Sequence, residues 1–252
     1  ARVLARHPHR LIDIREPEQA YSAADFRADA LREIADIHAR GRIPLLVGGT
    51  GLYFRALERG LSEMPRADPA LRERLAEEVR VYGKLHMHRK LAMCDARTAA
   101  RLDANDVQRV LRALEVFELS GVPISEQQGG VRGRLPWRVL KLGLVAADRS
   151  NLRLRIAERF DQMLAQGLEN ELRSLRARPG WSADLPSMRA VGYRQGWDWL
   201  DGKVSATDFR MHALHATSQL AKRQMTWLRS EHDAWLFDCD AAASPSRIHA
   251  AL

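Results

Sequence analysis

The sequence predicts an α/β fold, with a parallel sheet flanked by helices and an all-helical insertion domain. The segment 11–57 is expected to run strand, helix, strand, helix, an order typical of a parallel sheet. Ile43 to Val47 form an almost continuous apolar run, which favours a strand buried on both faces. Residues 66–128 show no convincing strand pattern. We therefore expect an α/β core made of residues 1–65 and 129–252, and a helical insertion at 66–128.

The chain is strongly basic. Its 252 residues include 40 Lys and Arg against 32 Asp and Glu, a formal charge of +8. This excess favours a polyanionic partner, nucleic acid first; a basic protein without such a partner is the alternative. No apolar run approaches the roughly 18 residues that suggest a membrane span, so we expect no membrane partner. Cys94 and Cys239 are far apart without metal-ligand or redox spacing, which favours a cytoplasmic location.

In the first part of the core, Leu11 to Ile14 is expected to form a short strand. Ser22 is expected to cap a helix, with Asp25 in the reciprocal position of a capping box. After the apolar run, a glycine-rich turn leads into a helix near Leu52, through Gly48, Gly49 and Gly51. Such a turn exposes backbone N–H groups near a helix N-terminus, where phosphate or another polar ligand can bind, and Thr50 adds a hydroxyl. An ordinary tight connection is the alternative.

The insertion is expected to contain three main helical stretches. Asp68-Pro69 opens the first, from Leu71 to about Val81, and a second lies around Leu85 to Met93. A third starts at Asn105-Asp106, carries a helical stripe of apolar residues and ends at Gly121.

Beyond the insertion, strand character returns at Trp137 to Val145. Ser150 is expected to cap a long helix that carries Phe160. A short helix follows around 190–200, then a longer one at about 206–229, and Trp235 to Phe237 is expected to form a last strand.

Four clusters of basic residues could bind an anionic ligand. In the insertion, Gln108, Arg109 and Arg112 share a helix face on which Glu115 can hold Arg112. After Ser150 come Arg153, Arg155 and Arg159, and an arginine at the ligand-binding edge of a sheet can clamp pyrophosphate. For both clusters a solvated helix surface is the alternative interpretation.

The third and fourth clusters interleave basic and aromatic residues, as in sites for unpaired nucleotides. The third is Arg189, Ala190, Val191, Gly192, Tyr193, Arg194 and Gln195, in which Gly192 allows close approach and Tyr193 offers a stacking plane. The fourth is Lys222, Arg223, Gln224, Met225, Thr226, Trp227, Leu228 and Arg229. The histidines form no ligand pattern, so we expect no metal site built by the protein, and any metal to be carried by phosphates.

Six motifs in order resemble the bacterial tRNA dimethylallyltransferases, also called tRNA isopentenyltransferases. The resemblance covers about residues 7–237. The motifs are Pro8 to Ile14, Tyr21 to Phe26, Leu46 to Tyr53, Asp106 to Val116, Val191 to Gln195, and Ala221 to Arg229.

The resemblance implies a P-loop-kinase-like core and transfer of a dimethylallyl group from dimethylallyl diphosphate to N6 of the adenosine 3′ of the tRNA anticodon. Mg²⁺ is implied, held mainly by the substrate diphosphate and by residues upstream of this chain. The resemblance places Thr50 on the substrate channel and Arg159 at the leaving diphosphate, so both are expected to be catalytic. It implies tRNA contacts by Thr50, Arg72, the segments 189–195 and 222–229, and Gln108, Arg109, Val110, Leu111 and Arg112. We expect a monomer.

Members of this family begin with a P-loop and a nearby catalytic Asp. No G-x-x-x-x-G-K-[ST] motif occurs in this chain, which starts at Ala1 without an apolar signal-peptide core. We expect the chain to begin partway into a domain, with about fifty further residues upstream in a typical member. Two alternatives stay open: prenylation of free adenine nucleotides, and a non-catalytic RNA-binding fragment.

Overall fold

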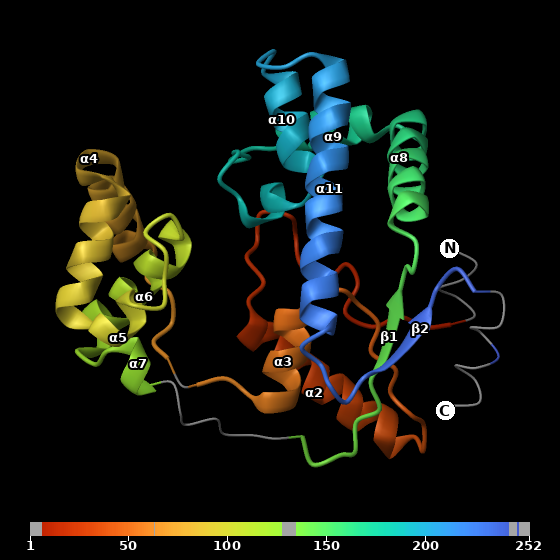
Figure 1. The fold of residues 1–252 in the computed structure, drawn as a ribbon, viewed down its shortest axis with the longest axis horizontal. Helices are drawn as coiled ribbons and strands as arrows, with labels where there is room; N and C mark the ends of the chain where they lie inside the picture. The colour runs from red at the N-terminus through yellow and green to blue at the C-terminus, as the bar shows by residue number, and fades with distance from the viewer. Residues whose placement is uncertain (1–6, 63, 128–134, 242–245, 247–252) are drawn as a thin grey trace. The chain divides into compact units, whose positions relative to one another are not determined.

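The computed structural model describes residues 7–62, 64–127, 135–241 and 246. The chain divides into two compact units (Figure 1). The core unit comprises Ala1–Phe54 and Pro136–Leu252, and the helical unit comprises Arg55–Leu135. The boundaries predicted from sequence were 65/66 and 128/129.

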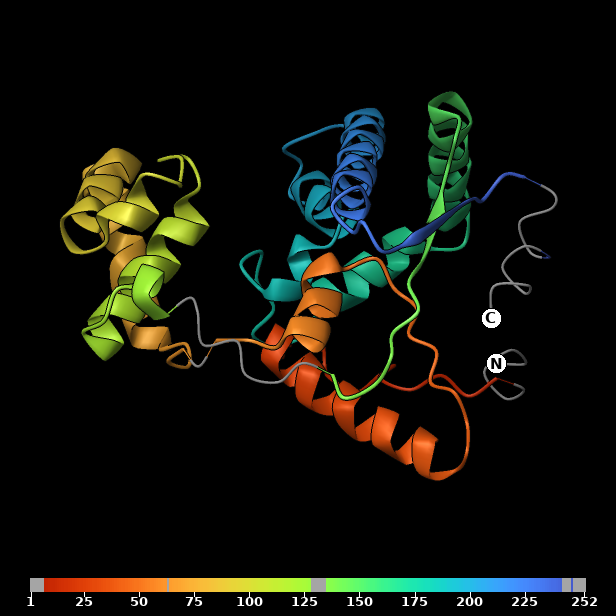
Figure 2. The ribbon, with the colours of Figure 1, turned by 60° about the horizontal axis from the view of Figure 1, so that its bottom comes forward.

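The core unit is built from helices around a small sheet (Figures 1 and 2). Helix α11 packs against α8 and α10, and α9 packs against both α8 and α10. The elements of the core unit are α2 (Ala23–Ala39), the start of α3 (Gly51–Arg59), β1 (Leu142–Val145), α8 (Arg149–Ala165), α9 (Leu168–Arg176), the 3-10 helix η1 (Pro186–Arg189), α10 (Tyr193–Leu200), α11 (Ala206–Leu228) and β2 (Trp235–Asp238).

Aromatic packing closes the core of this unit. The buried ring of Phe209 stacks on Trp199 at 5.0 Å and meets Phe160 edge to face at 5.5 Å. Leu168 and Leu172 of α9 complete the cluster. This core joins α8 to α11 into one helical layer.

The sheet of the described residues consists of β1 and β2, which pair in parallel with Leu142 opposite Trp235. The parallel pairing and the strand at 235–238 confirm two predictions. The strand predicted at 137–145 is shorter than expected, since β1 begins at Leu142. The predicted α/β fold class, with a parallel sheet and a helical insertion, is confirmed.

The two strands predicted before residue 50 are absent from the described structure. Leu11 and Asp13 have φ of 60° and 55°, which a strand cannot contain. Ile43 is 90% and Val47 86% exposed, so the predicted burial on both faces is wrong. An apolar run records a preference for burial, but a strand also needs a neighbour to hydrogen-bond with, and no described segment pairs with 43–47.

Local start and stop signals were mostly predicted correctly. Ser22 and Asp25 form the expected capping box of α2. For α8, the cap is Asp148 rather than Ser150, because the Asp148 carboxylate accepts the backbone N–H of Ser150.

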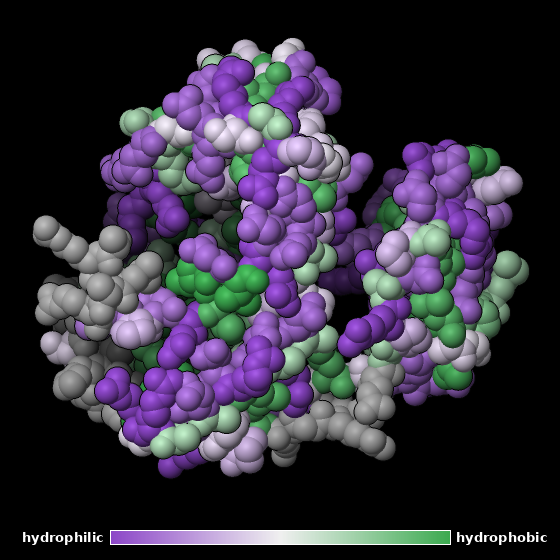
Figure 3. Space-filling view, turned by 180° about the vertical axis from the view of Figure 1, so that it is seen from behind, coloured by the Kyte–Doolittle hydropathy of each residue, from purple (hydrophilic) through white to green (hydrophobic). Residues whose placement is uncertain are grey.

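Apolar side chains such as Leu144 (58% exposed) remain at the surface, and green apolar areas are visible among the polar ones in Figure 3. None of the described helices could span a bilayer.

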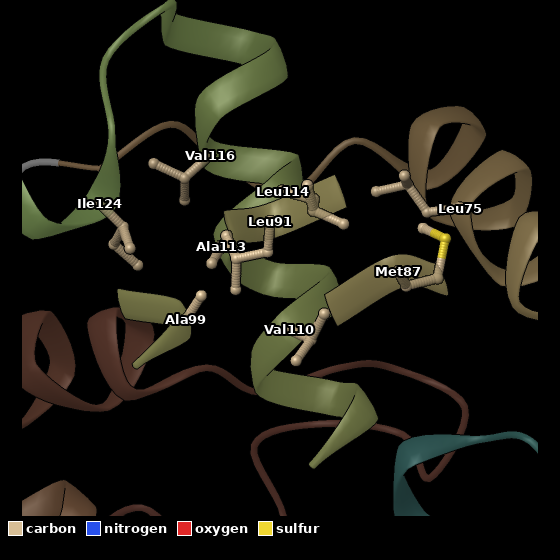
Figure 4. Packing of buried hydrophobic residues seen from close by; sticks show 9 residues of the cluster. All are labelled: Leu75, Met87, Leu91, Ala99, Val110, Ala113, Leu114, Val116 and Ile124. Carbon is tan, nitrogen blue, oxygen red and sulfur yellow. The ribbon is translucent and has the colours of Figure 1, made fainter. Parts of the chain in front are cut away.

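The helical unit contains α4 (Pro69–Cys94), α5 (Ala96–Ala99), α6 (Val107–Ser120) and α7 (Ile124–Gln127). Helix α4 is interrupted at Gly83, where φ is 79°. This glycine separates two helical stretches, as the sequence predicted. Helix α6 begins after the Asp106 cap and ends at Gly121 in the left-handed conformation. Its apolar face packs on α4 in a continuous core (Figure 4) formed by Leu75, Met87, Leu91, Ala99, Val110, Ala113, Leu114, Val116 and Ile124.

We predict that Met87→Ala destabilises the helical unit by about 2–5 kcal/mol, because it leaves a cavity in this core. Met93, 83% exposed on the same helix, provides the matched control: Met93→Ala should change the free energy of unfolding by less than about 0.5 kcal/mol. Urea denaturation followed by circular dichroism measures both variants. Equal losses of stability in the two variants would contradict the burial of Met87 in this core.

Candidate nucleic-acid interface

The glycine-rich turn at 48–51 lies against the C-terminal part of α11. The Gln224 side-chain amide donates to the Gly49 carbonyl at 3.3 Å. A Cβ at Gly49 would come within 2.2 Å of Gln224 Nε2, and one at Gly51 within 2.2 Å of the Trp227 ring. Only glycine fits between these two side chains without a shift. Two sequence motifs that lie 175 positions apart are therefore one structural site.

Thr50 occupies the exposed tip of this turn. Its carbonyl accepts the backbone N–H of Tyr53 at 2.9 Å, which starts helix α3. Thr50 directly precedes α3 in the chain, and the first backbone N–H groups of a helix favour an anionic or polar ligand. This geometry is compatible with the predicted substrate contact of Thr50, which stays a prediction.

Aromatic contacts hold the start of α3. The Tyr53 ring stacks on Phe26 of α2 at 4.7 Å, and its hydroxyl donates to the Tyr21 carbonyl at 3.0 Å. The Tyr21 hydroxyl in turn donates to Asp29. Burial, with the neighbouring Asp29 carboxylate, raises the pKa of Tyr21 to about 12, so this phenol stays a neutral donor. The turn is thus supported by α2 on one side and α11 on the other.

The fourth cluster divides into two roles. Gln224 and Trp227 contact the turn, so their side chains support it. Among the other members, Lys222, Arg223, Thr226 and Arg229 are exposed, while Met225 and Leu228 are partly buried. The cations of this segment are accordingly available to a ligand beside Thr50's turn.

In the third cluster, Gly192, Tyr193 and Gln195 make structural contacts. The Gly192 N–H donates to the Gln195 side chain at 2.8 Å, which caps α10, and φ at Gly192 is 96°, a conformation that favours glycine. Tyr193 packs on the core and its hydroxyl donates to Glu171. Burial first, then Glu171, raises the pKa of Tyr193 to about 12. Tyr193 is therefore anchored through its hydroxyl, and the stacking plane expected of its ring stays a prediction.

Other members of this cluster face solvent. Arg189, Ala190 and Arg194 are exposed, and Val191 is partly buried. In the α8 cluster, Arg159 is exposed next to the buried Phe160, as the spacing suggested. Arg155 instead pairs with Asp240 at 2.6 Å.

In the helical unit, a buried carboxylate organises the arginines. Glu115, whose side chain is 1% exposed, accepts Arg72 Nε at 2.8 Å and Arg112 Nη1 at 2.7 Å. The backbone N–H of Asp68 adds a third donor at 3.1 Å. Arg112 also donates to the Pro65 carbonyl at 2.9 Å. The predicted pairing of Glu115 with Arg112 is confirmed, whereas that of Glu115 with Arg72 was missed.

The remaining predicted contacts on α6 have mixed accessibility. Gln108 and Arg109 are exposed, and Arg109 lies 3.2 Å from Asp106. Val110 is 1% exposed and Leu111 packs against the same core. The side chain of Val110 therefore cannot touch a ligand while the core is intact. The reason is the helical period, since positions 110 and 114 face inward together.

Three neighbouring side chains within the described ranges could jointly approach a cation: Asp238, Cys239 and Asp240. Sequence spacing alone did not single them out. Mg²⁺ prefers oxygen ligands, so the thiol does not suit it, and Asp240 is already paired with Arg155. This cluster does not fit a resident Mg²⁺.

Comparison with known proteins decides the family. The profile of a family described as IPP transferase matches residues 1–231.

This chain belongs to the IPP transferase family.

The curated tRNA dimethylallyltransferase of Alkalilimnicola ehrlichii is 56% identical over 238 residues, which cover 94% of this chain and 75% of that protein. The tRNA dimethylallyltransferase of Bordetella pertussis is 52% identical over 246 residues, covering 96% and 79%. The resemblance inferred from six motifs is thereby confirmed.

Solved structures agree with this assignment. The full-length tRNA isopentenylpyrophosphate transferase of Bacillus halodurans is 36% identical, with a TM-score of 0.65 over 96% of this chain and 76% of that one. A eukaryotic dimethylallyltransferase, solved acting on tRNA, has a TM-score of 0.70 over 92% of this chain and 61% of that one. At 24% identity, this second likeness supports the fold.

We predict that Gly51→Ala lowers the free energy of unfolding by about 1–3 kcal/mol, because its Cβ would collide with the Trp227 ring. Gly48→Ala is the matched control in the same turn, since its Cβ would meet Phe54 at an ordinary 3.6 Å. Urea denaturation of the two variants measures the difference. A Gly51→Ala protein as stable as Gly48→Ala would contradict the close approach of α11.

We predict that the contribution of Glu115 to stability depends on pH. Burial alone would raise the pKa of Glu115, but hydrogen bonds from Arg72 and Arg112 outweigh it and hold the pKa below the ordinary 4.5. The stabilisation is therefore complete above about pH 4.5 and is lost as the pH falls through the lowered folded-state value.

The Glu115→Gln variant tests this dependence, because its side chain has the size of glutamate and no charge. At pH 7 it should be less stable than the parent by about 1–3 kcal/mol. The difference should shrink as the solution is acidified below pH 4.5. Thermal unfolding across this range measures it, and a gap independent of pH would rule out the ionic contribution.

Proposed function

We propose that this protein transfers a dimethylallyl group from dimethylallyl diphosphate to N6 of the adenosine 3′ of the anticodon in tRNA. The observation that carries the proposal is the joining of the Gly48–Gly51 turn to the Lys222–Arg229 segment, in a chain of the IPP transferase family. That joint site offers an exposed hydroxyl, a helix N-terminus and several cations together. Its relatives are named as tRNA dimethylallyltransferases.

The proposed reaction forms a bond between the adenosine N6 and the C1 carbon of the prenyl group. The C1–O bond breaks with its electron pair leaving on diphosphate, and N6 loses one proton. Negative charge therefore gathers on the leaving oxygens, where a fixed cation lowers the barrier. We assign this role to Arg159, whose guanidinium is exposed, and we assign contact with the nucleotide to Thr50.

Binding of tRNA is proposed to use exposed or partly exposed cations in each unit. In the core unit these are Lys222, Arg223 and Arg229, together with Arg189 and Arg194. In the helical unit they are Arg72 and Arg112, whose guanidinium groups Glu115 holds in place. The excess of basic residues in the chain supports this choice of partner, because phosphate contacts dominate RNA affinity.

We further propose that Mg²⁺ enters with the diphosphate, since the described carboxylates do not form a site suited to it. Its contribution would be charge neutralisation on the diphosphate oxygens. As part of the same proposal, the protein acts in the cytoplasm as a monomer.

The test combines tRNA binding with a transfer assay. Filter binding at two salt concentrations should give tight tRNA affinity that falls steeply with salt. The protein expressed from its complete reading frame should transfer radiolabelled dimethylallyl groups to an anticodon stem-loop and not to adenosine monophosphate. Labelling of the free nucleotide alone would favour the alternative reaction, and salt-independent or absent tRNA binding would reject the proposal.

We predict that the double variant Lys222→Ala, Arg223→Ala weakens tRNA binding similarly for all sequences and reduces the salt slope by about 2, roughly 1 per phosphate contact. The control is Arg32→Ala, which removes an exposed arginine paired with Asp29 on α2. Filter binding over a salt series gives both slopes. An unchanged slope in the double variant would remove these two residues from the interface.

A further inference from the structure

A concave site lies in the core unit and includes two arginines of the third basic cluster. It is a cavity of about 300 Å³ between the loop before η1 and helix α10. Its lining contains two cations, two carboxylates, an aromatic ring and a buried apolar floor, namely Arg189, Arg194, Asp184, Asp198, Trp197 and Met188. No step of the proposed reaction uses Asp184, Asp198 or Trp197.

We propose that this cavity binds one guanine nucleotide of the tRNA, separate from the adenosine that reacts. The inference rests on the proposed function, because it takes RNA as the ligand. The size suits a single nucleotide, since pockets of a few hundred Å³ hold ligands of that size.

The two arginines suit the phosphate. Arg189 ends η1 and Arg194 lies in the first turn of α10, so both come from short rigid elements on either side of Gly192. Both are exposed, and neither is paired in the part of the chain that the structure describes. Arginine forks bind phosphate oxygens through paired N–H groups.

Trp197 suits the base. The Arg176 guanidinium lies over its ring, 5.0 Å from the centroid, and also pairs with Asp201 at 2.6 Å. These contacts hold the indole in one orientation at the cavity wall. Stacking of a base on an aromatic ring is a common way to bind an unpaired nucleotide.

The carboxylates select guanine. An ionised carboxylate only accepts hydrogen bonds, and guanine has two adjacent donors, N1–H and the N2 amino group, on one edge. Asp198 has Lys203 nearby at 3.7 Å, whereas Asp184 has no hydrogen-bond or ion-pair partner among the described residues. Asp184 is therefore the residue assigned to the guanine edge.

The experiment replaces each guanine of a tRNA transcript in turn by inosine, which lacks only the N2 amino group. With the wild-type protein, one replacement should weaken binding roughly tenfold. In the Asp184→Asn variant, the same inosine replacement should weaken tRNA binding by less than about twofold, because the carboxylate that accepts the hydrogen bond is already gone. Asp36→Asn, on the exposed face of α2 and outside the cavity, should keep the wild-type pattern.

A second variant separates base recognition from phosphate binding. Arg194→Ala should reduce the salt slope by about 1 and leave the inosine effect in place, whereas Asp184→Asn should leave the slope unchanged. If tRNA binds normally but no guanine position responds to inosine, or if Asp184→Asn keeps the full response, the guanine site is rejected while the proposed function stands. If the wild-type protein binds no tRNA, the proposed function fails, and this inference fails with it.

Discussion

The close approach of α11 to the Gly48–Gly51 turn is the constraint on which the candidate site depends. A Cβ at Gly51 would lie 2.2 Å from the Trp227 ring, so the turn approaches α11 this closely because Gly51 has no side chain. That contact brings the turn that carries Thr50 to the helix segment that carries the exposed cations Lys222 and Arg223. It also explains why an aromatic and an amide occur within an otherwise basic segment: they support the turn, and their neighbours remain available for a ligand.

The helical unit uses the opposite principle, in which a buried charge arranges exposed ones. Leaving Glu115 buried alone would be costly, and its two arginines together with the Asp68 N–H compensate that cost. In return, each guanidinium is held in place while part of its side chain stays in solvent. Side chains that are positioned before binding lose less entropy when they meet a phosphate, so this arrangement favours RNA contact as well as stability.

Charges in the core unit fall into structural and available groups. Arg155 pairs with Asp240, and Arg176 pairs with Asp201 while covering Trp197. Arg159, Arg189 and Arg194 are exposed. The net charge of +8 therefore does not distinguish the cations that hold the fold together from the cations that can contact a polyanion. The cavity beside α10 combines both kinds, since a paired arginine fixes the ring and unpaired arginines line the opening.

Sequence alone determined the features that depend on a few neighbouring residues: the Ser22 capping box, the limits of α6 at Asp106 and Gly121, and the link from Glu115 to Arg112. Six ordered motifs also sufficed to recognise the family. Tertiary structure decided what depends on distant partners. It left Ile43 to Val47 exposed, anchored Tyr193 to Glu171, and brought Arg72 to Glu115 from 43 positions away. The physical reason is that hydrogen bonds within one helical turn are encoded locally, whereas burial and pairing require a partner that no local pattern specifies.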